Sequence, residues 1–257
     1  MSEEYDVESQ TFEIWKGSTN GNTFGNPRLG FVKKVYGILS CQLLFTTLFI
    51  LLAQTSLYSF FQPSGQYYNP LAQTLFYLAT FGALATSLVV ACFTSVARQV
   101  PTNYILLGIF TLCESYVCAY FTTFFTPSDV LLAAFLTCSL TIALTLYAFT
   151  TKNDFTIYGG ALWIIGWTLF AISFVFFIIN IDKYPSLRPV NTVFSVIVVC
   201  FYGFYLLYDT QLIMGGKRFS LDLDDYILAA MVIYIDIIIL FMRILRIVAA
   251  ARGNSRN

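Results

Sequence analysis

The sequence predicts an all-α membrane protein, a bundle of seven transmembrane helices. Hydrophobic residues make up 58% of the 257 residues and charged residues only 11%, whereas a soluble domain has about 25% charged residues. Seven apolar segments alternate with short polar breaks, and each is long enough for the roughly 20 residues of a spanning helix. A soluble chain of this size has no core large enough to hide so much apolar surface.

The chain begins with a polar stretch, residues 1–30, which we expect to be a flexible cytosolic tail because it is rich in Gly, Asn, Ser and Thr. The spanning segments are predicted at residues 35–61, 71–96, 103–125, 129–150, 158–180, 189–214 and 226–247. Prolines in the breaks mark places where helices should stop. The breaks are short, so we expect one transmembrane domain over residues 31–250 and a short C-terminal tail at 251–257.

Lysine and arginine set the predicted orientation, because cytosolic loops carry an excess of both. An N-terminus in the cytosol places most of them on the cytosolic side: Lys16, Arg28, Lys33, Lys34, Arg98, Lys152, Lys217 and Arg218. Only two fall in the opposite loops, Lys183 and Arg188.

The last apolar segment is ambiguous in this respect. Its length favours a helix that spans the membrane and puts the C-terminus in the lumen. Four arginines favour a segment that returns to the cytosolic side: Arg243, Arg246, Arg252 and Arg256. We predict seven spans, because segment length is a more reliable guide than the charge of a tail.

Composition also excludes several functions. The net charge is zero, so nothing indicates a nucleic-acid partner. Histidine is absent, which excludes imidazole metal sites and Ser-His-Asp catalysis. The six cysteines lie in apolar segments without a CxxC pair, and no nucleophile–base set is visible. We therefore predict a protein that is not an enzyme and has no bound cofactor.

Two carboxylates in the last two spans are the candidate functional residues. Asp209 lies in the stretch FYGFYLLYDTQLIM and Asp236 in AAMVIYIDIIILFM. An ionised side chain in hydrocarbon costs at least roughly 2.5–3.5 kcal/mol, so two of them around one loop indicate function. Residue counts put Asp209 about 8 Å and Asp236 about 16 Å from the cytosolic surface, so they meet only if the last helix starts at a shallower depth.

Two carboxylates in a low dielectric cannot both ionise cheaply and tend to share a proton. Protonation then changes local hydrogen bonding and can bias a two-state packing of helices. The deprotonated oxygens are hard ligands that suit transient contacts with Ca²⁺. The alternative is that Asp209 and Asp236 are satisfied separately by tyrosine, threonine or backbone groups on neighbouring helices.

Two further residues are possible partners of this pair. Glu114 lies within the third segment at a depth similar to that of Asp236, and Arg98 lies at the cytosolic end of the second. Arg98 is also readily interpreted as an interfacial anchor. The acidic run Asp222, Asp224 and Asp225 lacks the spacing of an EF-hand, and we expect it to stabilise the start of the last helix through the helix dipole.

Three motifs resemble the Bax-inhibitor-like transmembrane family, specifically its Lifeguard branch: VYGILSCQLLFT, LYAFTTKNDFT, and LYDTQLIMGGKR followed by DDYILAAMVIYIDIIILFMRILR. The likeness extends from about residue 31 to residue 246. It implies a seven-helix bundle with the last helix central and wrapped by the others. It also implies a pH-sensing pair at the positions of Asp209 and Asp236. In bacterial relatives an arginine at the end of the second helix interacts with that pair, and Arg98 is the nearest counterpart.

The resemblance implies a pH-sensitive Ca²⁺ leak across intracellular membranes and suppression of cell death, with calcium and protons as the permeant and regulating ions. A Ca²⁺/H⁺ exchanger using the same carboxylates is one alternative. A membrane scaffold that binds death-regulating membrane proteins is another. The endoplasmic reticulum is the expected organelle, although the Golgi and the vacuole also fit.

Overall fold

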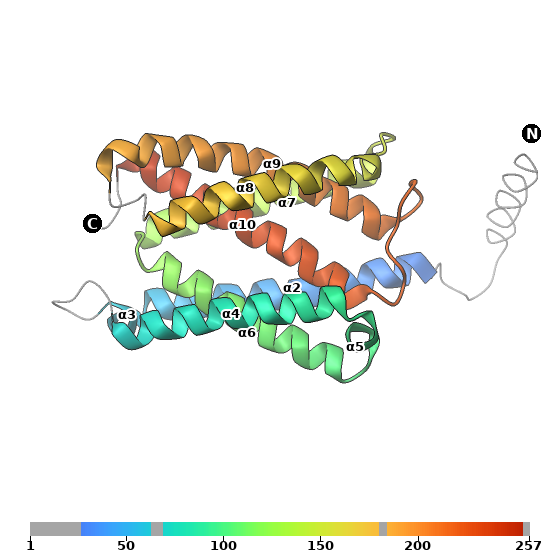
Figure 1. The fold of residues 1–257 in the computed structure, drawn as a ribbon, viewed down its shortest axis with the longest axis horizontal. Helices are drawn as coiled ribbons and strands as arrows, with labels where there is room; N and C mark the ends of the chain where they lie inside the picture. The colour runs from blue at the N-terminus through green and yellow to red at the C-terminus, as the bar shows by residue number, and fades with distance from the viewer. Residues whose placement is uncertain (1–26, 63–68, 180–183, 254–257) are drawn as a thin grey trace, which may run out of the picture.

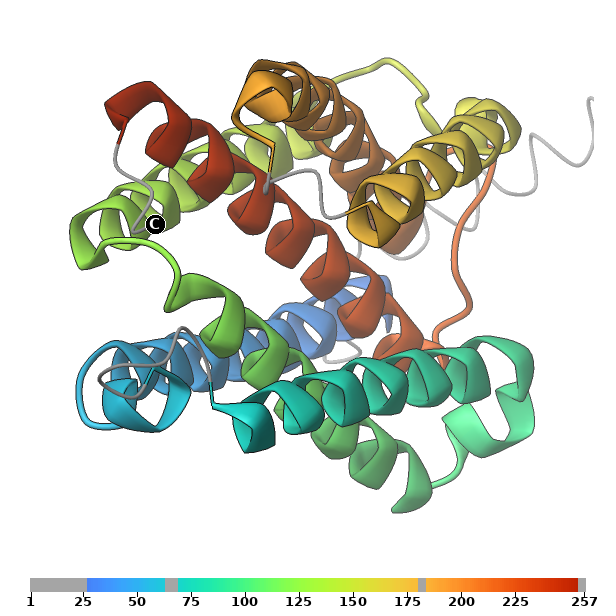
Figure 2. The ribbon, with the colours of Figure 1, turned by 60° about the vertical axis from the view of Figure 1, so that its left-hand side comes forward.

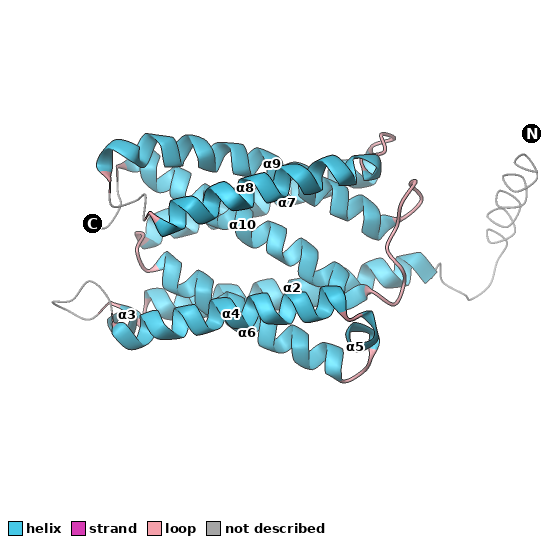
Figure 3. Ribbon diagram, viewed as in Figure 1, coloured by secondary structure: helices cyan, strands magenta, loops and turns pink. Residues whose placement is uncertain are grey.

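The computed structural model describes residues 27–62, 69–179 and 184–253. Seven of its helices are long and apolar enough to cross a membrane. They are α2 (Pro27–Gln54), α4 (Pro70–Cys92), α6 (Thr102–Thr122), α7 (Pro127–Thr150), α8 (Gly159–Ile178), α9 (Arg188–Met214) and α10 (Tyr226–Arg252). Shorter elements join them: α3 (Tyr58–Phe61), α5 (Thr94–Arg98), η1 (Thr156–Tyr158) and η3 (Pro185–Leu187). Helices dominate the described part of the chain (Figure 3), so the predicted all-α class with seven spans is confirmed.

Local sequence explains where several helices begin and end. Proline occupies the first turn of α4, where its missing N–H is not needed, and the Asn69 side chain accepts a hydrogen bond from the Leu71 amide at 3.0 Å. Thr126 caps α7 in the same way before Pro127. At the other end, α9 stops at Gly215, whose φ of 68° favours glycine.

Several predicted boundaries were wrong. The first span runs from Pro27 to Gln54, so residues 27–30 belong to α2 and not to the predicted tail, and residues 58–61 form the separate short helix α3. The second span ends at Cys92, and a separate short helix, α5, carries Arg98. The last span continues to Arg252. Residues 1–26 of the predicted tail, together with Lys183 and Arg256, lie outside the described residues.

The helices form two layers with α10 between them. In Figure 1, α2, α4 and α6 lie on one side of α10, and α7, α8 and α9 lie on the other. Figure 2 shows α10 (red) running diagonally between these layers. Of the most apolar 18 residues of α10, 67% are buried, against at most 44% in any other spanning helix. The last helix is therefore central, as the resemblance implied.

Positive residues that were predicted to share the cytosolic side gather at one end of the bundle. Arg28 donates to the carbonyls of Leu221 at 2.6 Å and Leu212 at 2.5 Å. Lys217 donates to the carbonyl of Lys152 at 3.0 Å. The Arg28 contacts tie α2 to α9 and to the α9–α10 connection, and the Lys217 contact joins that connection to the α7–α8 connection. We call this end of the bundle the predicted cytosolic end.

Candidate functional site

Asp209 lies near the predicted cytosolic end of α9, five residues before the helix stops at Met214. Its side chain is buried, with 5% exposure. Gly215 and Gly216 follow with φ of 68° and 75°, which turns the chain toward α10. A Cβ on Gly215 would lie 2.8 Å from Nε of Arg28, which would have to shift, and the positive φ of this residue strains any residue with a side chain.

Asp236 lies ten residues after the start of α10 and is 2% exposed. Its carboxyl group faces that of Asp209 within side-chain hydrogen-bonding range. The separation in depth expected from residue counts was wrong, because α10 crosses the bundle at an angle to α9 (Figure 1). The structure thus brings together the two carboxylates that the sequence singled out.

The paired carboxylates receive few hydrogen bonds. Oδ2 of Asp209 and Oδ2 of Asp236 are both buried and have no hydrogen-bond partner among the described residues. Two tyrosines of α9 lie near the pair and interact with it electrostatically: Tyr205 with both aspartates, and Tyr202 with Asp236. Such a pair, with both carboxyl groups buried and facing each other, favours one shared proton over two negative charges.

The residue two positions after Asp209 anchors this end of α9. Gln211 is fully buried. Its Oε1 accepts from the Phe155 amide at 2.8 Å, and its Nε2 donates to the Asn153 carbonyl at 3.0 Å. The helix that carries Asp209 is therefore fastened to the α7–α8 connection two residues after the aspartate.

Arg98 does not contact the pair. Its Nε donates to Oδ1 of Asp225 at 2.7 Å, and its Nη2 donates to Oδ2 of Asp222 at 2.9 Å. Asp225 precedes Asp236 by eleven residues, about 16 Å along the helix. The hydrogen bonds that the Arg98 guanidinium donates, first to Asp225 and then to Asp222, raise its pKa above the ordinary value.

Two residues of the acidic run before α10, Asp222 and Asp225, bind Arg98. Asp225 is the residue preceding the helix, yet its side chain makes no capping hydrogen bond to the first turn. The expected interaction with the helix dipole stays a prediction, and the structure adds a partner that was not expected, because Arg98 pairs with both Asp222 and Asp225.

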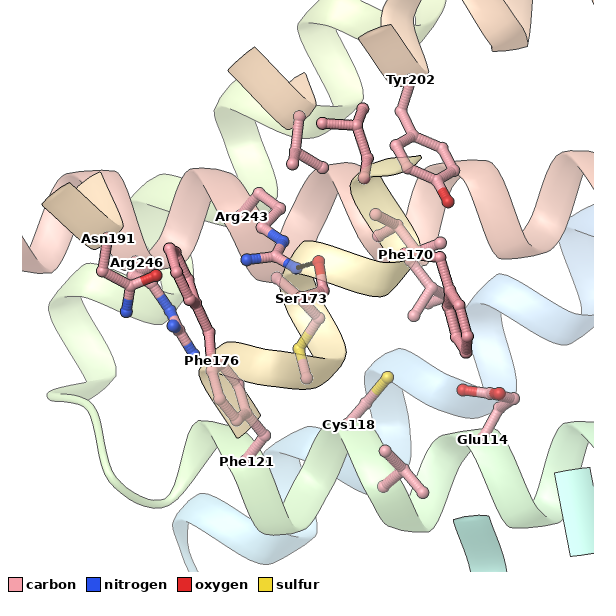
Figure 4. A pocket seen from close by; sticks show the side chains of 16 residues that line it. Glu114, Cys118, Phe121, Phe170, Ser173, Phe176, Asn191, Tyr202, Arg243 and Arg246 are labelled. Atoms are coloured by element: carbon pink, nitrogen blue, oxygen red, sulfur yellow. Dashed lines mark hydrogen bonds between the residues drawn. The ribbon is translucent and has the colours of Figure 1, made fainter. Parts of the chain in front are cut away.

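Glu114 lies on α6 beside a cavity of about 450 Å³. The cavity is bounded by α6, α8, α9 and α10, and Arg243 and Arg246 of α10 line it as well (Figure 4). Tyr202, which neighbours Asp236, also lines it. Glu114 thus belongs to this cavity, and the structure does not place it in contact with Asp209 or Asp236.

Sequence reasoning missed three features of the interior. Arg243 and Arg246 were assigned to the C-terminal charge excess, yet both face the cavity. Arg252 pairs at 3.1 Å with Asp129, which is fully buried at the start of α7. The spacing of Arg243 and Arg246, three residues apart on one helical face, was the signal that pointed to the interior.

A buried polar cluster also connects α2, α6 and α10. Oγ1 of Thr46 lies 2.9 Å from Oγ of Ser115 and 2.8 Å from Oη of Tyr234. Gln42 donates to Thr111 at 2.9 Å one turn away. None of these residues is charged, so the search for ionisable side chains did not find them.

The described residues contain no group of three or more His, Cys, Asp or Glu side chains that could hold a metal ion. Ca²⁺ takes 6–8 oxygen ligands, and Asp209 and Asp236 supply only part of such a shell.

Comparison with known proteins supports one family. Residues 28–253 match the family described as Inhibitor of apoptosis-promoting Bax1. The chain is 32% identical to Protein lifeguard 3 of Mus musculus over 224 residues, which cover 87% of this chain and 70% of that protein. It is 28% identical to Protein lifeguard 3 of Homo sapiens over 217 residues, or 84% of this chain and 67% of that protein. It is 30% identical to Bax inhibitor 1 of Schizosaccharomyces pombe over 232 residues, or 90% and 80%. The chain therefore belongs to the Bax inhibitor family of membrane proteins and to its Lifeguard branch.

Proposed function

We propose that this protein is a pH-sensitive Ca²⁺ leak pathway of an intracellular membrane and that it suppresses cell death. One observation carries the proposal: the carboxyl groups of Asp209 and Asp236 face each other in the buried contact between α9 and the central helix. The family name, Inhibitor of apoptosis-promoting Bax1, supports the cellular role. The endoplasmic reticulum is the proposed location.

The proposed gate is the contact between α9 and α10. With one shared proton the two carboxyl groups attract each other and hold the helices together. Loss of that proton leaves two negative charges in a low dielectric, where their repulsion is much stronger than in water. The helices then separate or admit a cation, and either change alters the path past the pair.

Calcium is the proposed permeant ion because carboxylate oxygens are its preferred ligands. The buried Oδ2 atoms of both aspartates, which have no protein donor among the described residues, are available to a passing cation. A pair with few ligands also releases the ion readily, as conduction requires.

The test is Ca²⁺ release from liposomes that contain the purified full-length protein, measured over a range of pH. We expect a leak whose rate changes with pH, and Asp209→Asn and Asp236→Asn should each flatten that change. A rate that follows an opposing proton gradient would show exchange of Ca²⁺ for H⁺. Absence of Ca²⁺ flux at every pH from correctly folded protein would contradict the proposal.

A further inference from the structure

A groove of about 590 Å³ lies between α2 and α6, which pack against each other in one layer of the bundle (Figure 1). We propose that it binds one anionic phospholipid from the bilayer leaflet at the predicted cytosolic end. The headgroup phosphate of the lipid lies against the ammonium group of Lys34, and one acyl chain lies in the groove. This inference does not depend on Ca²⁺ conduction or on the aspartate pair.

Glycines on both helices leave the space that the acyl chain occupies. Gly37 of α2 and Gly108 of α6 line the groove, and a Cβ built on either one would meet nothing within 4 Å. Larger apolar side chains surround this space, among them Ile38, Phe45 and Leu107. Phe45 is 43% exposed, so the groove opens to the outside of the bundle, where a spanning helix meets hydrocarbon. An acyl chain can therefore enter it sideways from the bilayer.

The length of the groove corresponds to one leaflet. Lys34 and Phe45 both line it and are eleven residues apart on α2, which is about 16 Å along the helix. The hydrocarbon core of a bilayer is about 30 Å thick, so the groove extends through about half of it. Lys34 is nearer to the predicted cytosolic end, where Arg28 lies. A lipid of that leaflet fills the whole groove, whereas a free phosphate would occupy only the end at Lys34.

The ammonium group of Lys34 is held in place by a neutral ring. Its Nζ lies 3.2 Å from the ring centre of Tyr226, the first residue of α10. Asn103, which is fully buried on α6, donates from Nδ2 to Oη of Tyr226 at 3.0 Å. An aromatic ring attracts an ammonium group through its quadrupole and carries no charge that would neutralise it. Lys34 therefore presents a positive charge in a fixed position.

The charge near this end of the groove favours an anion. The described residues that line the groove include no aspartate or glutamate. Asp225, which precedes Tyr226, is paired with Arg98 at 2.7 Å. Lys34 itself is exposed, so a headgroup can reach it. Basic residues near the cytosolic surface attract anionic lipids, and the apolar groove below Lys34 adds the chain contacts that retain one of them.

The test is native mass spectrometry of the purified full-length protein with defined lipids. Dioleoyl phosphatidylglycerol provides the anionic headgroup, dioleoyl phosphatidylcholine provides the same chains without net charge, and inorganic phosphate provides the anion without chains. We expect one tightly held phosphatidylglycerol per chain, weak retention of phosphatidylcholine, and no displacement by phosphate at the same concentration. Equal retention of both lipids, or displacement by phosphate, would overturn the proposal.

A substitution at Gly108 tests the groove. Gly108→Leu should lower retention of phosphatidylglycerol at least about tenfold, because the leucine side chain takes the place of the acyl chain. The change should leave folding intact, since the site is open and leucine favours a helix more than glycine does. Gly160→Leu is the matched control: Gly160 of α8 is equally open and does not line the groove. Unchanged retention by folded Gly108→Leu protein would overturn the proposal.

A substitution at Lys34 tests the charge. Lys34→Gln should lower retention of phosphatidylglycerol at least about tenfold and leave that of phosphatidylcholine unchanged, because charge-assisted hydrogen bonds to the phosphate are lost. Lys33→Gln is the matched control, since Lys33 is exposed and does not line the groove. Equal losses in the two variants would indicate diffuse attraction to the positive end of α2 and would overturn the proposal. If Lys34→Gln does not fold, the outcome with Gly108→Leu still decides.

Discussion

Arg98 and Asp225 form a two-pronged contact, in which Nε donates to Oδ1 at 2.7 Å and Nη2 donates to Oδ2 at 2.9 Å. This contact ties α5 to the residue that precedes the central helix. Asp222 adds a second partner at 2.9 Å. The α9–α10 connection is thus held to α5 by Arg98 and to α2 by Arg28, in addition to the contacts of Lys217 with the α7–α8 connection.

We predict that Arg98→Gln loosens this connection without moving the pH response. The substitution removes the ion pairs with Asp222 and Asp225, so hydrogen exchange at residues 219–226 should accelerate. The pH dependence of Ca²⁺ flux should stay where it is, because the aspartate pair lies about three turns further along α10. Arg218→Gln is the control, since the hydrogen bond of Arg218 to Asp154 uses its backbone amide. A displaced pH profile in Arg98→Gln would show that Arg98 acts on the pair.

Asp154 should make stability fall in acid. The Thr156 hydroxyl, helped by the backbone amides of Arg218 and Thr156, holds the pKa of the Asp154 carboxyl below its ordinary value. A lowered folded pKa means that the carboxylate stabilises the fold fully above the unfolded pKa of about 3.9 and loses this effect as pH falls through the folded value. Asp154→Asn should therefore lower the midpoint temperature of thermal unfolding at pH 7, and the difference in this temperature between variant and wild type should shrink at pH 3. A constant difference over this range would rule out the carboxylate charge as the cause.

The members of the polar cluster around Thr46 should contribute unequally to the free energy of unfolding. Tyr234→Phe keeps the edge-to-face packing on Phe110 and removes one hydroxyl, which should cost about 0.5–1.5 kcal/mol of unfolding free energy. Thr46→Val deprives both Ser115 and Tyr234 of a partner, so its cost should be larger, roughly 1–3 kcal/mol. Reversible unfolding in detergent measures both. A smaller loss for Thr46→Val than for Tyr234→Phe would show that the cluster does not act through Thr46.

Much of the fold could be predicted from the sequence because hydrophobic length and proline positions are local signals. The spans beginning near residues 71, 103, 129 and 226 start within one or two residues of α4, α6, α7 and α10. The first span was placed too late because Arg28, Lys33 and Lys34 make its first turns polar. Asn26-Pro27 is a helix-start signal that outweighs this polarity.

The site was only partly predictable, because contacts between helices depend on tilt. Asp209 and Asp236 were identified as unusual carboxylates, but counting residues along straight helices separated them in depth. The sequence pattern also grouped Arg243 and Arg246 with the charges of the C-terminal tail, whereas the packing of α8 and α9 around α10 places them inside. Arg98 was expected at the end of the bundle where it lies, but its contacts with Asp222 and Asp225 were not predicted.

The orientation of the bundle remains a prediction from charge. The N-terminus should be cytosolic and the C-terminus lumenal, because the described helices provide seven spans and the positive loops gather at one end. A glycosylation acceptor appended after Asn257 should be modified in cells, and an acceptor added before Met1 should not be. The reverse pattern would invert the assignment of the predicted cytosolic end. Modification at neither end would indicate that the two termini share the cytosol.

The last prediction concerns the coupling between Asp209 and Asp236. Because their carboxyl groups face each other, the proton that they share belongs to the pair and not to one residue. Asparagine at either position keeps the volume and removes titration, so each single change should flatten the pH dependence of Ca²⁺ flux. The double change should add little to either single change, because residues that act as one unit are not additive. Glu114→Gln is the matched control: it neutralises another interior carboxyl group, one that lies beside the arginine-lined cavity, and it should leave the pH profile unchanged. Additive effects of the two aspartate substitutions would show that the carboxylates titrate independently, and an unchanged profile in both single variants would make them structural.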